Sequence, residues 1–505
     1  MTDSTISGTN EDLLEPITPL AAIDLGSNSF HVILAIKQPK NWRVIDRHKE
    51  LTRLASGLGE SRQIRKKSMN VAHQALLRIG QRIRPLPRRN VRIVGTQALR
   101  VAKNSNEFIK TAQKILGHKI EIISGREEAR LIYLGANHSF DHQLNHRLVV
   151  DIGGGSTEIV RGERFETQQG ESLPMGCTSI TEKYFPKGRI TKSGFKRAIN
   201  RVMEELQGYK RYFPDESWEL ALGTSGTIQA IQKAINSTDS PVLITKNRLG
   251  DLRRQLVEFG NTDTIDTSLC SKERARVFPG GVAILTAVFQ SLDIDEMHVT
   301  DGALREGLLY DLCGRIQDQD VRESTVLDLL RRFHIDERHA RRVEDTALHL
   351  FDQVKVQWEL DEIEDRLLLR WSALLHEIGL DISHVRYHRH GEYLLHNLDL
   401  PGFSLREQVM VANLVLAHRR KFPTKQLTDD KSIEKLAILL RLAVVLRRNR
   451  TSDSLPRSKL TVNASSIHLE LPKKWLKHQY LTLMDIEREM RYLRSIHYKL
   501  SLSDR

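Results

Sequence analysis

The sequence predicts an α/β protein in which one structural unit occurs twice, followed by a mainly helical region. The first observation is a repeated phrase: "AAIDLGSNSFHVILAI" at residues 21–36 returns as "LVVDIGGGSTEIV" at residues 148–160. The residues that align without gaps, at a constant offset of 127 (151 − 24), are Asp24 with Asp151, Gly26 with Gly153, and Ser29 with Ser156. The second observation is that strand-like and helix-like segments alternate after each phrase, which is typical of α/β units.

The first copy predicts strands and helices in alternation. An alternating apolar run at 19–36 predicts a strand pair, and "WRVID" at 42–46 continues the strands. The segments that follow are an amphipathic helix at 65–84, a strand at 90–96, a helix at 105–116, a strand at 119–124 and a helix at 126–136.

The second copy restarts the same order after the polar stretch at 137–146. Its expected elements are a strand pair at 147–162, a helix around 192–208, a strand at 218–224, a helix at 225–235, an apolar segment at 274–292 and a strand at 297–307. The agreement in order between the copies predicts two similar domains end to end.

From about residue 318 helical spacing dominates, and 12 of the 20 histidines lie at 319–505. Strand-like pieces such as "KLTVNASSIHLELP" at 459–472 predict a small terminal unit. The expected organisation is a disordered tail at 1–17, a first domain at 18–136, a second domain at 137–317 and a helical region with a small α+β unit at 318–505.

Composition restricts the class of protein. No stretch of the 505 residues approaches the roughly 18 apolar residues of a membrane span. Residues 1–17 lack the basic start and apolar middle of a signal peptide, so we expect a cytoplasmic protein. Three cysteines far apart in sequence predict small buried residues rather than a disulfide framework.

The charge is unevenly distributed. The chain carries a net charge of +13, and residues 403–459, with 13 Lys or Arg and 5 Asp or Glu, supply +8 of it. Such a basic excess attracts a polyanion or an acidic lipid surface, so association with the inner face of a membrane is one expectation. The alternative is a solvated helical face. We expect Arg419, Arg420 and Lys421 to follow a long polyanion.

Each copy of the repeated phrase places an aspartate at a strand end and a glycine-rich turn after it. Glycine lets the backbone turn with positive φ and approach a ligand closely. Successive N–H groups in such a turn form a concave anion site, and an adjacent carboxylate suits Mg²⁺ beside phosphate. Two copies therefore predict a clamp on a phosphate chain; the alternative is that Asp24 and Asp151 only cap two duplicated turns. "GTSGT" at 223–227 adds another turn and favours the clamp.

Five segments together resemble the exopolyphosphatase and guanosine pentaphosphate phosphohydrolase family: "DLGSNSFH", "DIGGGSTE", "SGREEARLIY", "GTSGT" and "DGALREG". "RHGEYLLHNLDLPGF" at 389–403 continues the resemblance into the helical region. It implies the actin-like fold shared with sugar kinases and Hsp70-type ATPases, in which paired hairpins hold phosphates between two duplicated domains. It also implies a homodimer.

The resemblance implies roles for the matching residues. Taken alone, Glu127 and Glu128 would be charges that complement a helix dipole, but Glu128 matches the family's catalytic base. The expected metal ligands, for Mg²⁺, are Asp24, Asp151 and Glu158. The residues expected to bind phosphate are Gly26, Ser27, Asn28, Ser29, Arg100, Gly153, Gly154, Gly155, Ser156 and Thr157.

The helical region resembles an HD phosphohydrolase domain in its layout. Such a domain binds metal through a histidine, an adjacent His-Asp pair and a late aspartate. Here His339 and His376 are present, but Glu377 replaces the paired aspartate, and no aspartate lies near Val444. We therefore expect an HD-like fold without its metal chemistry.

The resemblance implies Mg²⁺-dependent hydrolysis of a terminal phosphoanhydride. The basic stretch and the C-terminal segments favour inorganic polyphosphate as substrate, with release of orthophosphate. The closest alternative is removal of the 5′-terminal phosphate of guanosine pentaphosphate, because the catalytic residues do not separate the two substrates. A kinase of the same superfamily and a non-catalytic polyanion binder are less favoured, and we expect no nucleic-acid partner.

Overall fold

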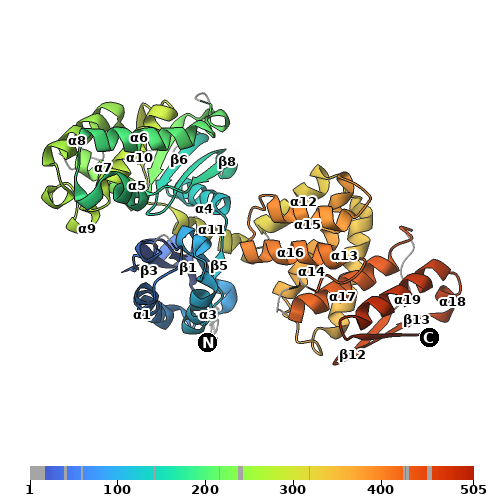
Figure 1. Ribbon diagram of the computed structural model, residues 1–505. Coiled ribbons are helices and arrows are strands. Elements are labelled where there is room, and N and C mark those ends of the chain that lie inside the picture. Colours follow the sequence, from blue (N-terminus) through green and yellow to red (C-terminus); the bar gives the residue numbers. More distant parts are fainter. Residues whose placement is uncertain are drawn as a thin grey trace, which may run out of the picture. The chain divides into compact units, whose positions relative to one another are not determined.

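The computed structural model describes residues 18–38, 42–58, 61–140, 143–214, 217–236, 243–317, 319–424, 427, 431–451 and 458–504. The tail expected at 1–17 lies outside these residues. The chain divides into two compact units, Met1–Asp318 and Gln319–Arg505, which are described separately (Figure 1).

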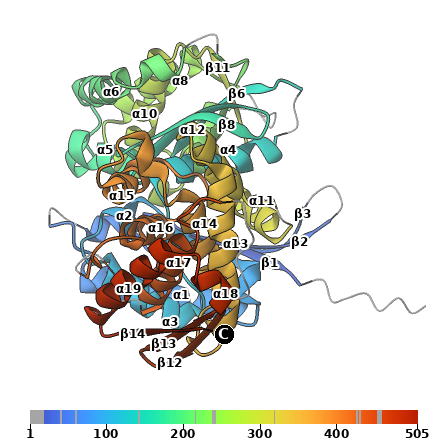
Figure 2. The same cartoon turned by 90° about the vertical axis from the view of Figure 1, so that its right-hand side faces the viewer.

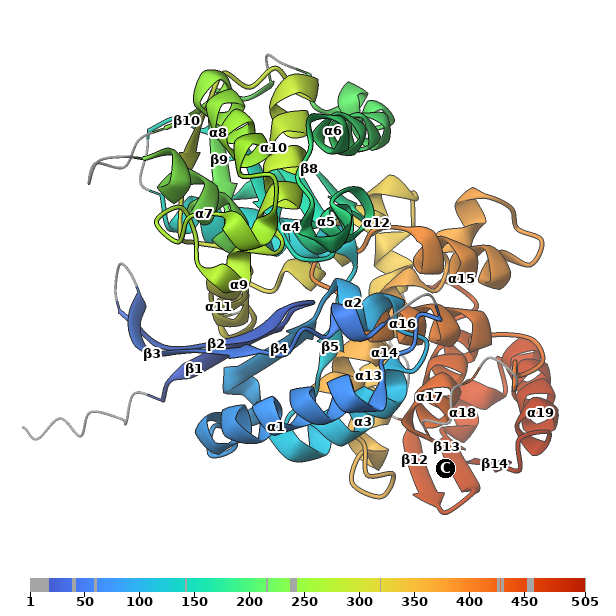
Figure 3. The ribbon, with the colours of Figure 1, turned by 60° about the vertical axis from the view of Figure 1, so that its left-hand side comes forward.

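The first lobe of the first unit is a five-stranded sheet in the order β3-β2-β1-β4-β5. Its strands are β1 (Leu20–Leu25), β2 (Ser29–Lys37), β3 (Trp42–Leu51), β4 (Val91–Gly95) and β5 (Glu121–Ile122). Its helices are α1 (Lys66–Ile83), α2 (Gln97–Val101) and α3 (Ser105–Leu116). Helices α1 and α3 cover one face of this sheet, where their apolar side chains join one core (Figure 3).

The second lobe repeats this plan in a sheet of order β10-β11-β9-β6-β7-β8. Its strands are β6 (His146–Ile152), β7 (Thr157–Glu163), β8 (Glu166–Leu173), β9 (Leu220–Thr224), β10 (Ile244–Thr245) and β11 (Glu296–Val299). Its helices are α5 (Cys177–Tyr184), α6 (Lys192–Gln207), α7 (Ser225–Ile235), α8 (Lys246–Phe259), α9 (Lys272–Ala275) and α10 (Phe278–Ser291).

The pairing of strands confirms the duplication. In each lobe the first strand pairs antiparallel with the second and parallel with the fourth, as β1 does with β2 and β4, and β6 with β7 and β9. A register shift falls between Leu34 and Ala35 in β2 and between Arg161 and Gly162 in β7, again 127 residues apart (161 − 34). The two sheets therefore share their irregularities as well as their order.

Two helices, α4 (Gly125–His138) and α11 (Leu304–Ile316), pack against each other between the sheets. They approach closely at Gly135 and Gly307. A Cβ added to Gly135 would lie 2.0 Å from the carbonyl oxygen of Ala303, and one added to Gly307 would lie 1.8 Å from that of Leu131. Only glycine permits this backbone contact, which holds α4 and the residues it carries in place.

The prediction of a strand at 297–307 is wrong for the second half of that segment. Strand β11 ends at Val299, and helix α11 begins at Leu304. The helix starts there because the Glu306 carboxylate accepts a hydrogen bond from the Ala303 N–H at 3.0 Å and satisfies a free donor of the first turn.

The second unit is a helical domain that ends in a three-stranded sheet (Figure 2). Its helices are α12 (Val321–Arg332), α13 (Glu337–Val354), α14 (Glu364–Leu375), α15 (Tyr387–Asn397), α16 (Leu405–Ala417), α17 (Lys431–Leu446), α18 (Lys473–Leu476) and α19 (Tyr480–Arg494). Its strands are β12 (Lys459–Asn463), β13 (Ser466–Leu471) and β14 (Lys499–Asp504). One continuous apolar core joins the helices to this sheet. Among the described helices, none has the length and apolar character needed to cross a membrane.

Candidate active site

The two glycine-rich turns face each other. The first joins β1 to β2 through Gly26, Ser27 and Asn28, and the second joins β6 to β7 through residues 153–156. A Cβ added to Gly155 would lie 3.0 Å from Ser27 Oγ, and one added to Gly154 would lie 3.6 Å from Asn28 Cβ. The sequence repeat thus becomes two turns in direct apposition, as a clamp requires.

A cavity of about 310 Å³ lies between the lobes at these turns. Its walls include Gly26, Ser27, Asn28 and Ser29 of the first turn and Gly153, Gly154, Gly155 and Ser156 of the second. Four buried carboxylates also face it: Asp24 at the end of β1, Asp151 at the end of β6, Glu158 on β7 and Glu128 in the first turn of α4; a fifth, the exposed Glu273 of α9, lies in its wall. The cavity therefore combines anion-binding backbone with buried acidic groups.

The carboxylates are held in a setting that disfavours their charge. Burial, and then the charge of Glu128, raise the pKa of Asp24 to about 8 and that of Asp151 to about 7. Burial likewise raises the pKa of Glu158 well above its ordinary value, although Ser172 Oγ donates to its carboxylate at 2.8 Å. Four buried acids need a cation to remain ionised together.

The donor set fits Mg²⁺. Oδ1 of Asp24 is buried and has no hydrogen-bond partner among the described residues, so an acceptor oxygen is left without a donor there. Asp24, Asp151 and Glu158 offer only hard carboxylate oxygens beside two phosphate-binding turns, which is the environment that Mg²⁺ prefers.

Glu128 is fixed by Arg100. Its Oε2 accepts a hydrogen bond from Arg100 Nη1 at 3.1 Å, and the same guanidinium donates to the Ile123 carbonyl at 2.8 Å and to Gln97 Oε1 at 2.7 Å. Burial raises the pKa of Glu128, and Arg100 opposes that rise. This pair orients one carboxylate oxygen and leaves the side chain at the cavity wall.

Arg100 and Thr157, both expected to bind phosphate, do not line the cavity as the structure describes it. Arg100 lies behind Glu128, and the Thr157 hydroxyl donates to the Met175 carbonyl at 2.7 Å. Direct phosphate contact by either residue stays a prediction.

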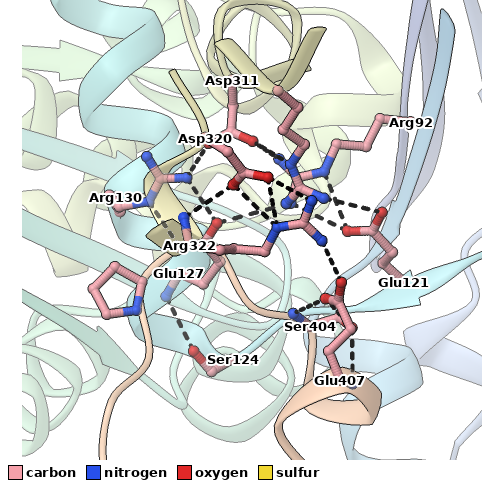
Figure 4. Close-up of polar contacts among 12 residues, drawn as sticks. Arg92, Glu121, Ser124, Glu127, Arg130, Asp311, Asp320, Arg322, Ser404 and Glu407 are labelled. Carbon is pink, nitrogen blue, oxygen red and sulfur yellow. Dashed lines mark hydrogen bonds and ion pairs between the residues drawn. The ribbon is translucent and has the colours of Figure 1, made fainter. Parts of the chain in front are cut away.

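Glu127 is buried rather than a surface charge of the first helical turn. It accepts two hydrogen bonds from Arg130, both at 2.8 Å, and lies 3.8 Å from Arg92 (Figure 4). Arg92 and Arg130 both bind Asp311 of α11. This network ties β4 and α11 to the helix that carries Glu128.

Figure 4 also shows Arg322 of the second unit, which binds Asp320 and Glu407 of the same unit.

A group of cations that the sequence did not predict lies in the cavity wall. Lys49 of β3, Arg274 of α9 and Arg305 of α11 line it, together with His31. Burial, followed by Arg274 and Arg305, lowers the pKa of Lys49, and burial with the same cations lowers that of His31 to about 3. Within the described residues neither Lys49 nor Arg274 forms an ion pair. Of the three cations, only Arg305 had a sequence signal, because it lies in "DGALREG"; His31 lies in "DLGSNSFH".

The residues expected to follow a polyanion lie just after α16. Arg419 stacks on the Tyr387 ring at 4.5 Å, and Arg420 and Lys421 are exposed. Backbone and ring contacts hold this segment, and its side chains reach solvent. The role of these three residues stays a prediction.

Comparisons with known proteins place the chain among phosphatases. Residues 32–316 match the Ppx/GppA phosphatase family, and residues 321–490 match Ppx/GppA phosphatase, domain III. A relative from Aeromonas hydrophila subsp. hydrophila, named guanosine-5′-triphosphate,3′-diphosphate pyrophosphatase, is 36% identical over 475 residues, covering 93% of this chain and 96% of the relative. One of the same name from Photobacterium profundum is 36% identical over 478 residues, covering 94% and 96%.

Solved structures confirm the expected fold. The PPX-GPPA enzyme of Aquifex aeolicus matches with a TM-score of 0.51 at 26% identity, covering 58% of this chain and 99% of that one. An exopolyphosphatase from Cytophaga hutchinsonii matches with a TM-score of 0.53 at 21% identity, covering 59% and 98%, and supports the fold alone. The two duplicated lobes therefore have the actin-like architecture implied by the sequence.

Proposed function

Because the chain belongs to the Ppx/GppA phosphatase family, whose members hydrolyse phosphoanhydrides, we propose that it removes the 5′-terminal phosphate of guanosine 5′-triphosphate 3′-diphosphate (guanosine pentaphosphate). One observation carries the reaction: two apposed glycine-rich turns and Glu128 line the same cavity. The basic C-terminal stretch favours inorganic polyphosphate as substrate. We propose the nucleotide as substrate instead. This choice is supported by relatives that carry this nucleotide in their names and align over 96% of their length.

The turns bind the 5′-phosphates. Backbone N–H groups and hydroxyls of residues 26–29 and 153–156 surround the cavity from both lobes, and such groups bind phosphate oxygens without adding further negative charge. Mg²⁺ held by Asp24, Asp151 and Glu158 would stabilise negative charge on these oxygens when it is bound. Because each lobe supplies one turn, the substrate is held only when both lobes surround it.

Glu128 acts as general base in the hydrolysis. A water oxygen attacks the terminal phosphorus while Glu128 accepts the water's proton, and the bond from that phosphorus to the bridging oxygen breaks. The bridging oxygen leaves with the electron pair as part of the shortened substrate, and the products are orthophosphate and guanosine tetraphosphate. Arg100 keeps the base oriented through its 3.1 Å hydrogen bond.

The cations Lys49, Arg274 and Arg305 support a substrate with phosphates at two positions. They line the same cavity as the turns but come from β3, α9 and α11. We assign them to the 3′-diphosphate, which lies across the ribose from the 5′-chain. GTP has the same 5′-triphosphate without that group, so it separates recognition of the 3′-diphosphate from hydrolysis.

We expect Arg274→Gln to lower kcat/KM for guanosine pentaphosphate by about tenfold or more, because one charge-assisted hydrogen bond to the substrate is lost. The same substitution should change kcat/KM for GTP by less than about twofold. The measurement is orthophosphate release from both nucleotides. Arg276→Gln, an exposed neighbour outside the cavity wall, is the matched control. Equal losses on both nucleotides would show that Arg274 does not recognise the 3′-diphosphate.

Inorganic polyphosphate is the second candidate substrate. The observation that favours it is the +8 charge of residues 403–459, which includes the exposed Arg420 and Lys421. These side chains would follow the part of a long chain that lies outside the cavity, with contacts that weaken as salt is added.

A further inference from the structure

A cluster of buried donor atoms lies in the second unit. It comprises His339 on α13 and His376 and Glu377, which directly follow α14. One donor atom from each residue lies within 4.8 Å of the other two, and all three residues are buried. The sequence predicted no metal site here, because Glu377 replaces the aspartate of the HD pattern and a late aspartate is missing. The structure nevertheless brings three donors together.

The imidazoles present unused lone pairs. His376 Nδ1 lies 2.7 Å from the Ala373 carbonyl, which accepts only, so this nitrogen carries the proton and Nε2 keeps its lone pair. Within the part of the chain that the structure describes, Nε2 of His376 is buried without a hydrogen-bond partner, and the residue is 1% exposed. Nδ1 of His339 is also buried, and none of the described residues forms a hydrogen bond with it. A backbone carbonyl that fixes the tautomer of a histidine is the usual outer contact of a metal ligand.

One carboxylate, Glu377, and two guanidinium groups, those of Arg450 and Arg342, act on the donor atoms. Glu377 supplies the negative charge. Its Oε1 binds Arg450, a side chain that is 44% exposed, and a carboxylate has a second oxygen for an ion. Arg450 thus compensates Glu377 when no ion is bound and can turn toward solvent when one is.

We propose that His339 Nδ1, His376 Nε2 and the Glu377 carboxylate bind a divalent first-row transition-metal ion, with water in the remaining position. Two imidazoles and one carboxylate suit such ions, whereas Mg²⁺ takes oxygen ligands almost exclusively. The site is separate in sequence and in chemistry from the carboxylates of the first unit. Its ion joins α13 to the end of α14 and should stabilise the second unit by mass action.

The test uses Co²⁺ and the full chain, after dialysis against a chelator and in excess Mg²⁺ to occupy the carboxylates of the first unit. We expect a visible d–d absorption band that saturates at one equivalent, and a rise in the unfolding temperature of the second unit. His376→Gln and His339→Gln should each weaken Co²⁺ binding by at least about tenfold, the lower end of the effect of disturbing a metal's contacts. His334→Gln, whose side chain is 80% exposed, is the control and should bind as wild type does.

Two results would overturn the site: wild-type protein with neither the absorption band nor the temperature shift, or equal Co²⁺ affinity in wild type and in both histidine variants. If a histidine variant fails to fold, Glu377→Gln takes its place. That change keeps the size of the side chain and removes the charged ligand, so the folded variant should lose the Co²⁺-dependent temperature shift. A shift retained in Glu377→Gln would also contradict the assignment.

Discussion

Glu128→Gln is expected to lower kcat for orthophosphate release by about 10²–10⁴-fold. Gln has nearly the same size and helix propensity as Glu, and its amide can still pair with Arg100, but it cannot accept a proton from water. Substrate binding and the unfolding temperature should change little, because the network beside α4 does not include Glu128. Steady-state kinetics with guanosine pentaphosphate and a thermal melt provide the two measurements.

Two controls accompany this variant. Glu127→Gln changes the residue just before Glu128. Because Glu127 binds Arg130 at 2.8 Å inside the protein, this substitution should lower the free energy of unfolding more than Glu128→Gln does. Glu273→Gln changes another carboxylate in the cavity wall and should leave kcat within a few-fold of wild type. The assignment of the base is wrong if Glu128→Gln retains kcat within about tenfold, or if Glu273→Gln loses as much.

Asp311→Asn is expected to lower the free energy of unfolding of the first unit by about 3–5 kcal/mol, the usual cost of removing one partner from a buried ion pair. Burial alone would raise the pKa of Asp311, but Arg92, Arg130 and Arg315 hold it well below its ordinary value. Arg92 is 1% exposed, and this carboxylate compensates its buried charge together with Glu121 at 3.2 Å and Glu127 at 3.8 Å. Urea unfolding, followed through the transition of the first unit, measures the loss.

The pH dependence follows from the lowered pKa. A depressed carboxyl pKa stabilises the folded state above the unfolded value of 3.8, and this contribution is lost as pH falls below it. The difference between wild type and Asp311→Asn should therefore be full at pH 7 and shrink in acid. Asp46→Asn breaks the 2.8 Å exposed pair with Arg82 and should cost less than about 1 kcal/mol. Equal effects of the two substitutions would show that the buried network contributes no special stability.

The sequence predicted those parts of the fold that leave a local pattern. Alternating apolar residues and a glycine-rich turn identified β1, β2, β6 and β7, and an acidic helix start identified α4. No strand was predicted at 166–173, where β8 forms, because "ETQQGESL" is mostly polar and only part of it is buried. The end of β11 was also missed, since a single cap by Glu306 decides where α11 begins.

Some residues of the candidate site also leave a local pattern in the sequence, and others do not. Asp24, Asp151 and the two turns were predictable because they occur twice in one register. Lys49 and Arg274 were not, since the fold brings them together from segments more than 200 residues apart, and neither belongs to a local motif. The burial of Glu127 was not predictable either. Its partner Arg130 also binds Asp311, and these two residues lie far apart along the chain. The substrate was the hardest feature to predict from the sequence, because both candidate substrates end in the same phosphoanhydride.

The most direct test of the proposed function compares kcat/KM for guanosine pentaphosphate and for long-chain inorganic polyphosphate in the presence of Mg²⁺. We expect a higher kcat/KM for the nucleotide, with orthophosphate and guanosine tetraphosphate formed in equal amounts. A higher kcat/KM for polyphosphate, or release of pyrophosphate from the nucleotide in place of orthophosphate, would contradict it.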